Sequence, residues 1–103
     1  MSGRAVMVRV TGRVQGVGFR YWAVEEAEAL GLSGWVRNEP DGSVAALLAG
    51  PGEAVEEMLG LLRQGPHGAV VDGIETEPAE PREAPREFPL VRRAIVQERH
   101  PHP

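Results

Sequence analysis

Valines alternate with other residues near the start of the chain, at Val6, Val8 and Val10. Alternation of β-branched residues is typical of a strand with one buried face, and it predicts a strand over 4–10. The pattern then becomes helical, because hydrophobic residues recur every three to four positions. This helical stripe ends at a glycine, which is a common helix terminator, and it consists of Phe19, Ala23, Ala27 and Leu30, followed by Gly31.

Strand-like and helix-like patterns continue to alternate through the middle of the chain. The turn-forming residues Pro40, Asp41 and Gly42 separate two strand-like runs and predict a hairpin. A second hydrophobic stripe at helical spacing, which starts near a proline and ends at a glycine, predicts a second helix. The predicted strands cover 32–38, 43–50 and 68–77, and the second helix covers 51–65.

The last quarter of the chain is less regular. Residues 78–87 are rich in proline and glutamate, which is typical of an exposed linker. Residues 88–91 predict a short fifth strand, and Pro89 restricts it to a sheet edge because proline has no N–H to donate. Residues 92–103 form a tail whose order the sequence does not determine.

The predicted order of elements is β-α-β-β-α-β, followed by the short last strand. This split βαβ arrangement predicts an α/β (α+β) sandwich, in which one antiparallel sheet carries both helices on one face. In such a sheet the third strand lies between the first and the second. The chain length of 103 residues suits a single domain over 1–103, with a core over about 4–91.

Composition excludes several classes of protein. The chain contains no cysteine, so disulfide bonds, thiol nucleophiles and thiolate metal sites are excluded. No hydrophobic run reaches membrane-spanning length and no signal-peptide pattern opens the chain, so we expect a cytoplasmic protein without membrane contact.

The charge is distributed unevenly along the chain. The net charge is −4, yet residues 1–24 contain four arginines and no acidic residue. A locally positive segment on an acidic protein favours one small anionic ligand, whereas nucleic-acid binding requires an extended basic face. We therefore expect no nucleic-acid partner, and we take a monomer as the default oligomeric state.

The segment between the first strand and the first helix reads "GRVQGVGFRYW" (12–22). Glycine allows backbone to approach a ligand closely and to turn its N–H groups toward it. The helix N-terminus and the planar guanidinium of Arg20 add positive charge that suits phosphate oxygens. The N–H groups of this expected oxyanion site come from Gly16, Val17, Gly18, Phe19 and Arg20.

Better-known phosphate loops do not match this segment. A Walker loop needs a lysine, which the chain lacks, and the dinucleotide fingerprint needs a glycine where Tyr21 stands. A glycine-rich turn that binds nothing is the alternative, and Arg20 together with the local positive charge favours the anion site. Tyr21, Trp22 and Trp35 are expected to pack rather than to form a stacking platform for bases.

Asn38 is the second candidate residue. It stands where the second strand meets its turn, and asparagine is common there for conformational reasons alone. Because the third strand lies between the first and second strands, the sequence does not show whether Asn38 reaches the glycine-rich loop. The histidines are more typical of surface residues than of a metal site, so no metal and no cofactor are expected; they are His67, His100 and His102.

These two segments together resemble the acylphosphatase family. "GRVQGVGFRYW" followed by "LGLSGWVRNEPDGSV" is similar to both halves of that family's signature, in order and in spacing. "GPHGAVV" (65–71) and "FPLV" (88–91) are similar to later segments of the family, so the resemblance covers roughly 5–91. Departures from the pattern fall outside the motifs, at Ala45 and at Leu61 and Leu62.

The resemblance implies a ferredoxin-like fold and metal-independent hydrolysis of the carboxyl–phosphate bond of acyl phosphates, which yields a carboxylate and inorganic phosphate. It implies that the loop from Gln15 to Arg20 holds phosphate through backbone N–H groups. Arg20 would bind the phosphoryl group, and Asn38 would orient the attacking water. The alternatives are a non-catalytic anion-binding or interaction module on the same fold, and a subunit or fragment resembling a domain of larger hydrogenase-maturation proteins.

Overall fold

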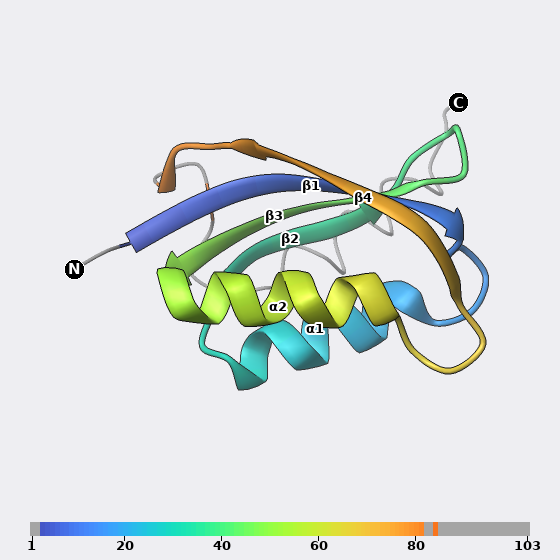
Figure 1. The fold of residues 1–103 in the computed structure, drawn as a ribbon, viewed down its shortest axis with the longest axis horizontal. Helices are drawn as coiled ribbons and strands as arrows, with labels where there is room; N and C mark the ends of the chain where they lie inside the picture. Colours follow the sequence, from blue (N-terminus) through green and yellow to red (C-terminus); the bar gives the residue numbers. More distant parts are fainter. Residues whose placement is uncertain (1–2, 82–83, 85–103) are drawn as a thin grey trace, which may run out of the picture.

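The computed structural model describes residues 3–81 and residue 84. The predicted fifth strand (88–91) and tail (92–103) lie outside the described residues, as does half of the predicted linker (78–87). Between these limits the element order is the predicted β-α-β-β-α-β (Figure 1). The elements are β1 (Gly3–Arg13), α1 (Phe19–Ala29), β2 (Ser33–Asn38), β3 (Val44–Pro51), α2 (Gly52–Gln64) and β4 (Val70–Pro78).

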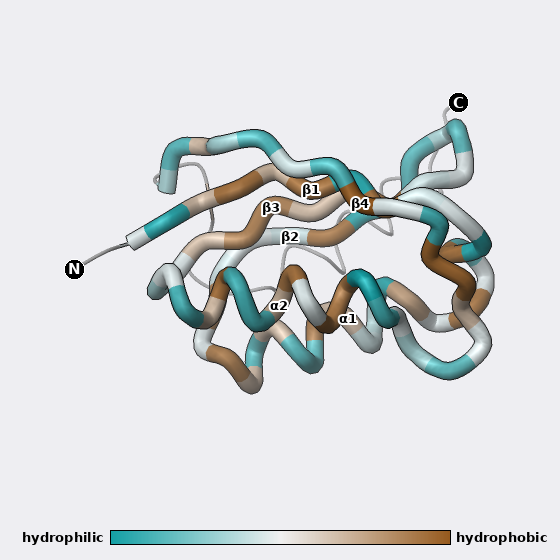
Figure 2. Tube along the Cα trace, viewed as in Figure 1, coloured by the Kyte–Doolittle hydropathy of each residue, from teal (hydrophilic) through white to brown (hydrophobic). Residues whose placement is uncertain are grey.

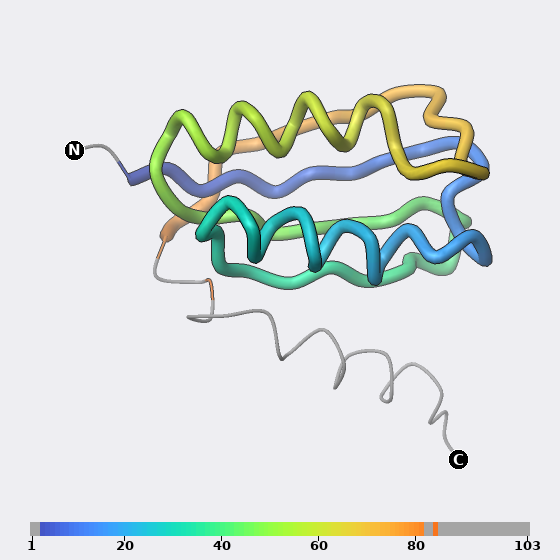
Figure 3. The backbone as a smooth tube through the Cα atoms, turned by 90° about the horizontal axis from the view of Figure 1, so that it is seen from below, coloured from blue at the N-terminus to red at the C-terminus, as the bar shows by residue number. Residues whose placement is uncertain are grey.

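The four strands form one sheet in the order β2-β3-β1-β4, and every neighbouring pair is antiparallel. This order confirms that the third strand lies between the first and the second. The two helices run side by side over one face of the sheet, as Figure 3 shows from the helix side. The molecule is therefore the two-layer sandwich that the order of elements predicts.

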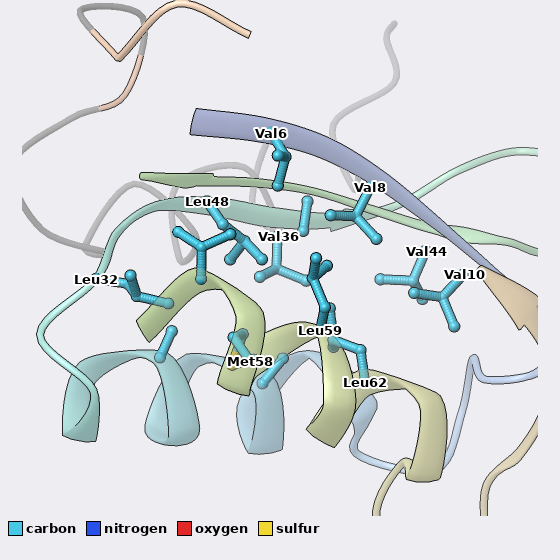
Figure 4. Packing of buried hydrophobic residues seen from close by; sticks show 14 of the residues in the cluster. Val6, Val8, Val10, Leu32, Val36, Val44, Leu48, Met58, Leu59 and Leu62 are labelled. Carbon is cyan, nitrogen blue, oxygen red and sulfur yellow. The ribbon is translucent and has the colours of Figure 1, made fainter. Parts of the chain in front are cut away.

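The sheet is most hydrophobic at its centre, along β1 and β3 (Figure 2). Residues 44–49 of β3 are all buried, and this strand is paired on both sides. On β1 the valines at 6, 8 and 10 are buried, and they point toward the helices, as their alternation predicts (Figure 4).

Each helix packs one hydrophobic face against the sheet, and together the two helices cover the core. Met58, Leu59 and Leu62 of α2 meet the valines of the sheet in Figure 4, and all three are buried. The buried residues of α1 are Phe19, Ala23 and Ala27. Burial of a large hydrophobic side chain stabilises a fold by about 1.5–3 kcal/mol, so this layer contact accounts for much of the stability.

β1 extends three residues beyond the predicted end of the first strand. Thr11 is followed by a register shift, after which Gly12 and Arg13 pair with Val71 and Val70 of β4. Gly12 has φ of 125°, and a Cβ at this position would lie 2.1 Å from the Val70 carbonyl oxygen, so only glycine fits. Pairing with a strand almost sixty residues away produces the extension, which the local pattern could not show.

Candidate functional site

The loop of residues 14–18 connects the end of β1 to the start of α1. Gly16 and Gly18 have φ values of 77° and 78°, in the left-handed region that favours glycine. A Cβ at either position would meet nothing within 4 Å. The backbone conformation therefore requires these glycines, and open space lies in front of them.

The first turn of α1 continues from this loop. Gly18 is the N-cap residue, and it makes no side-chain capping hydrogen bond. The first N–H groups of a helix have no intrahelical acceptor, and glycine brings no oxygen to them. Since the first turn also carries no acidic residue, this end of α1 is suited to an anion.

Phe19 fixes the position of this first turn. Its side chain is buried and meets Trp22 edge to face, with ring centroids 5.3 Å apart. Arg20 follows directly and is half-buried at the loop end of the helix. Tyr21 is 54% exposed, so the prediction that it packs was wrong, whereas Trp22 and Trp35 do pack against the core.

Asn38 is the last residue of β2 and pairs with Val44, which is level with Val10 on β1. Directly paired residues of an antiparallel sheet share a face. Val44 and Val10 are buried under the helices, so the half-buried Asn38 lies on the helix-covered face of the sheet. The glycine loop leads into α1 on that same face.

The side chain of Gln15 joins the loop to the turn that follows Asn38. Its Nε2 donates hydrogen bonds to the carbonyl oxygens of Glu39 and Ser43, both at 2.8 Å. The structure thus brings the loop and the end of β2 together at one end of the sheet, which the sequence left open. The sequence motif pointed only to the backbone N–H of Gln15, and the role of its side chain was missed.

Asp41 organises the β2–β3 turn. Its Oδ1 accepts hydrogen bonds from the Ser43 hydroxyl at 2.6 Å and the Ser43 N–H at 2.9 Å. Its Oδ2 accepts one from Arg9 Nη2 at 2.9 Å. The hydrogen bonds from Ser43, and secondarily the charge of Arg9, hold the pKa of Asp41 below its ordinary value. The turn residues were visible in the sequence, but the contact with Arg9 was not.

A shallow hollow of about 290 Å³ lies over residues of the other sheet face, which alternate with those under the helices. Two arginines contribute to it, and both are paired: Arg9 with Asp41, and Arg37 with Glu39 at 2.7 Å. Arg37 also lies over the Trp35 ring, 4.5 Å from its centroid. The predicted site residues do not line this hollow, so it is separate from the glycine loop.

Within residues 3–81 and 84, no group of three or more His, Cys, Asp or Glu side chains is placed to hold a metal ion. Neither helix among these residues is long and hydrophobic enough to cross a membrane. His67 is exposed in the α2–β4 loop, as expected of a surface histidine.

Comparison with protein families gives one assignment that covers most of the chain. The family model described as Acylphosphatase matches residues 6–90. An acylphosphatase of Rhizobium etli is 58% identical over 84 residues, which cover 82% of this chain and 89% of that protein. One of Rhizobium meliloti is 58% identical over 89 residues, covering 86% and 94%.

Solved structures agree with the sequence comparisons. The crystal structure of acylphosphatase from Bacillus subtilis matches with a TM-score of 0.78 and 36% identity, covering 82% of this chain and 93% of that chain. The crystal structure of full-length HypF in the phosphate- and nucleotide-bound form matches with a TM-score of 0.77 and 27% identity. That match covers 84% of this chain and 11% of the HypF chain.

Proposed function

The chain belongs to the acylphosphatase family and hydrolyses acyl phosphates, and we propose that the loop from Gln15 to Arg20 and Asn38 carry out this reaction. The assignment of these residues rests on the two hydrogen bonds that the Gln15 side chain donates to the turn after Asn38. It places the two candidate segments at the same end of the sheet.

The loop and the helix N-terminus would bind the phosphoryl group. The phosphate-binding set consists of Gln15, Gly16, Val17, Gly18, Phe19 and Arg20. Left-handed Gly16 and Gly18 let consecutive N–H groups converge on one oxyanion, and the start of α1 adds its positive dipole end. The guanidinium of Arg20 adds two parallel donors that match two phosphate oxygens. Open space in front of both glycines leaves room for the ligand.

Asn38 would orient the attacking water. Its side chain is an amide, which can donate one hydrogen bond and accept another, and so can hold a water molecule in a defined direction. It lies on the sheet face from which the loop and α1 approach. A water held there would face the phosphorus once the loop has bound the phosphoryl group.

The chemistry needs few further groups. Water oxygen forms a bond to phosphorus, the bond from phosphorus to the carboxyl oxygen breaks, and the carboxylate departs with its electron pair. A carboxylate is stable at neutral pH, so the leaving group needs no proton. The proton of the water passes to a phosphate oxygen of the substrate. Catalysis is then mainly positioning and charge stabilisation, and we propose that it needs no metal ion.

The finer properties stay predictions: the monomeric state, a cytoplasmic location, the absence of nucleic-acid partners, and the single domain over 1–103. The proposed contacts are all to the phosphoryl end of the substrate.

Hydrolysis of benzoyl phosphate in excess chelator, followed by ultraviolet absorbance, tests the proposed roles. Arg20→Ala should lose phosphate inhibition and lower kcat/KM by about 100- to 1,000-fold or more, because a charged oxyanion donor is removed. Asn38→Ala should lower kcat while inorganic phosphate still inhibits at the wild-type concentration. Equal loss of phosphate binding in both variants would contradict this division of roles. Phosphate binding by wild-type protein without any turnover would indicate a non-catalytic module.

A further inference from the structure

We infer that the Gln15 side chain is a positioning residue that sets the distance between the bound phosphoryl group and Asn38. It would do so by holding the phosphate-binding loop against the β2–β3 turn. This inference rests on the function proposed above for the loop and for Asn38. It concerns the side chain of Gln15, whereas phosphate binding involves only its backbone N–H.

The two acceptors of Gln15 flank the end of the β2–β3 hairpin. Glu39 is the residue directly after Asn38, and Ser43 is the residue directly before Val44. Asn38 and Val44 form the last pair of the β2–β3 ladder. A donor that holds both the Glu39 and the Ser43 carbonyl therefore holds the strand end that carries Asn38.

The amide nitrogen of Gln15 is fully used by these contacts. A side-chain NH₂ group has two hydrogens, and two carbonyl oxygens accept from it at 2.8 Å each. No hydrogen of this nitrogen is left for a substrate oxygen. The side chain thus acts on the reaction through the turn, and not by touching the phosphoryl group with its nitrogen.

The turn is held from a second direction as well. Arg9 of β1 donates to Asp41, and the Glu39 N–H donates to the Ser43 carbonyl at 2.9 Å. These contacts keep the turn folded and attached to β1. Loss of the Gln15 amide should therefore leave the hairpin intact and change only its position relative to the loop.

A change of this kind has a specific kinetic signature. Phosphate binding depends on the loop and Arg20, which stay in place. The attack of water depends on the distance between loop and Asn38, and a shift of about 1 Å in a reacting geometry can lower a rate by about 100-fold. We therefore expect kcat to fall while the inhibition constant of inorganic phosphate is retained.

The test is a double-mutant cycle with benzoyl phosphate as substrate and inorganic phosphate as inhibitor. Gln15→Met keeps the length of the side chain and removes the donor. It should lower kcat by about 10- to 100-fold with a phosphate inhibition constant within about twofold of wild type. In the Asn38→Ala background the same substitution should cause no further loss of kcat, because the side-chain amide that Gln15 would position is already absent.

Two further variants separate positioning from folding. Thr11→Val removes another side-chain hydrogen bond to a carbonyl, from Thr11 Oγ1 to Gly73 at 3.3 Å, and should leave kcat unchanged. Gln15→Glu places a carboxylate against the two carbonyls. Its kcat, relative to that of wild type, should recover as the pH falls and the carboxyl becomes a donor again.

The outcomes distinguish this inference from the proposed function. A wild-type kcat in Gln15→Met, an equal loss in both backgrounds, or a parallel loss of phosphate inhibition would overturn the role of Gln15 alone. A wild-type kcat in Asn38→Ala would instead overturn the role of Asn38, and with it this inference.

Discussion

Arg9 in β1 and Asp41 in the β2–β3 turn form a salt bridge of 2.9 Å, although 32 positions separate them in the sequence. The carboxylate of Asp41 also accepts both hydrogen bonds that Ser43 can donate to it. The Asp41 side chain thus closes the turn and attaches it to β1, one of the two central strands of the sheet. The stability of this turn should depend on the charge of Asp41.

Asp41→Asn should make the stability of the protein less sensitive to acid. The pKa of Asp41 is lowered in the folded state, first by the hydrogen bonds from Ser43 and then by Arg9, from an ordinary value of 3.8. Its stabilisation is therefore present above about pH 3.8 and is lost as the pH falls through the lower folded-state pKa. Unfolding midpoints of both proteins should differ at pH 6 and converge below pH 3.8. A difference that persists in strong acid would contradict a role for the Asp41 charge.

Gly18→Ala should impair phosphate binding beyond its effect on folding. A left-handed residue that carries a Cβ costs about 1–2 kcal/mol of folding free energy, and the new methyl group would project into the open space in front of the loop. Gly31→Ala is a matched control, because Gly31 has φ of 74° and equally open surroundings at the other end of α1. Both variants should melt at lower temperature, and only Gly18→Ala should raise the inhibition constant of phosphate. Equal phosphate inhibition constants in Gly18→Ala and Gly31→Ala would show that phosphate does not bind at this loop.

Arg20→Lys should retain part of the phosphate affinity. Lysine keeps the positive charge but loses the planar fork that can donate to two phosphate oxygens at once. Loss of one charge-assisted hydrogen bond corresponds to about a tenfold or larger increase in the phosphate inhibition constant. The constants for Arg20→Lys, Arg20→Ala and wild type, measured at one ionic strength, check this order. Identical values for the two variants would show that charge alone contributes nothing.

Phe19→Leu should affect both stability and phosphate binding. Phe19 is buried and anchors the first turn of α1 against the core and Trp22. A smaller side chain should lower the free energy of unfolding by about 1–2 kcal/mol and loosen that turn. Leu48→Val, deep in the sheet, should lower it by about 1 kcal/mol without changing phosphate inhibition. Chemical denaturation and inhibition assays at 25 °C compare the two. An unchanged inhibition constant in Phe19→Leu would show that the packing of Phe19 in the core does not affect phosphate binding.

Much of the fold follows from local patterns that the sequence displays directly. The alternation of Val6, Val8 and Val10 identifies a strand because successive side chains of a strand point to opposite faces. Gly31 is predicted to end the first helix, and α1 ends at Ala29, two residues before it. The order of these elements then restricts the topology to very few arrangements, and the split βαβ sheet is the one observed.

The sequence by itself therefore determined the elements, their order and the candidate residues of the site. Only the tertiary structure decided that β1 extends to Arg13, that Arg9 meets Asp41, and that Gln15 reaches the turn beyond Asn38. The reason is physical. Propensity and periodicity act over a few neighbouring residues, whereas these contacts join segments more than twenty positions apart, which become neighbours only when the strands pair and the helices pack.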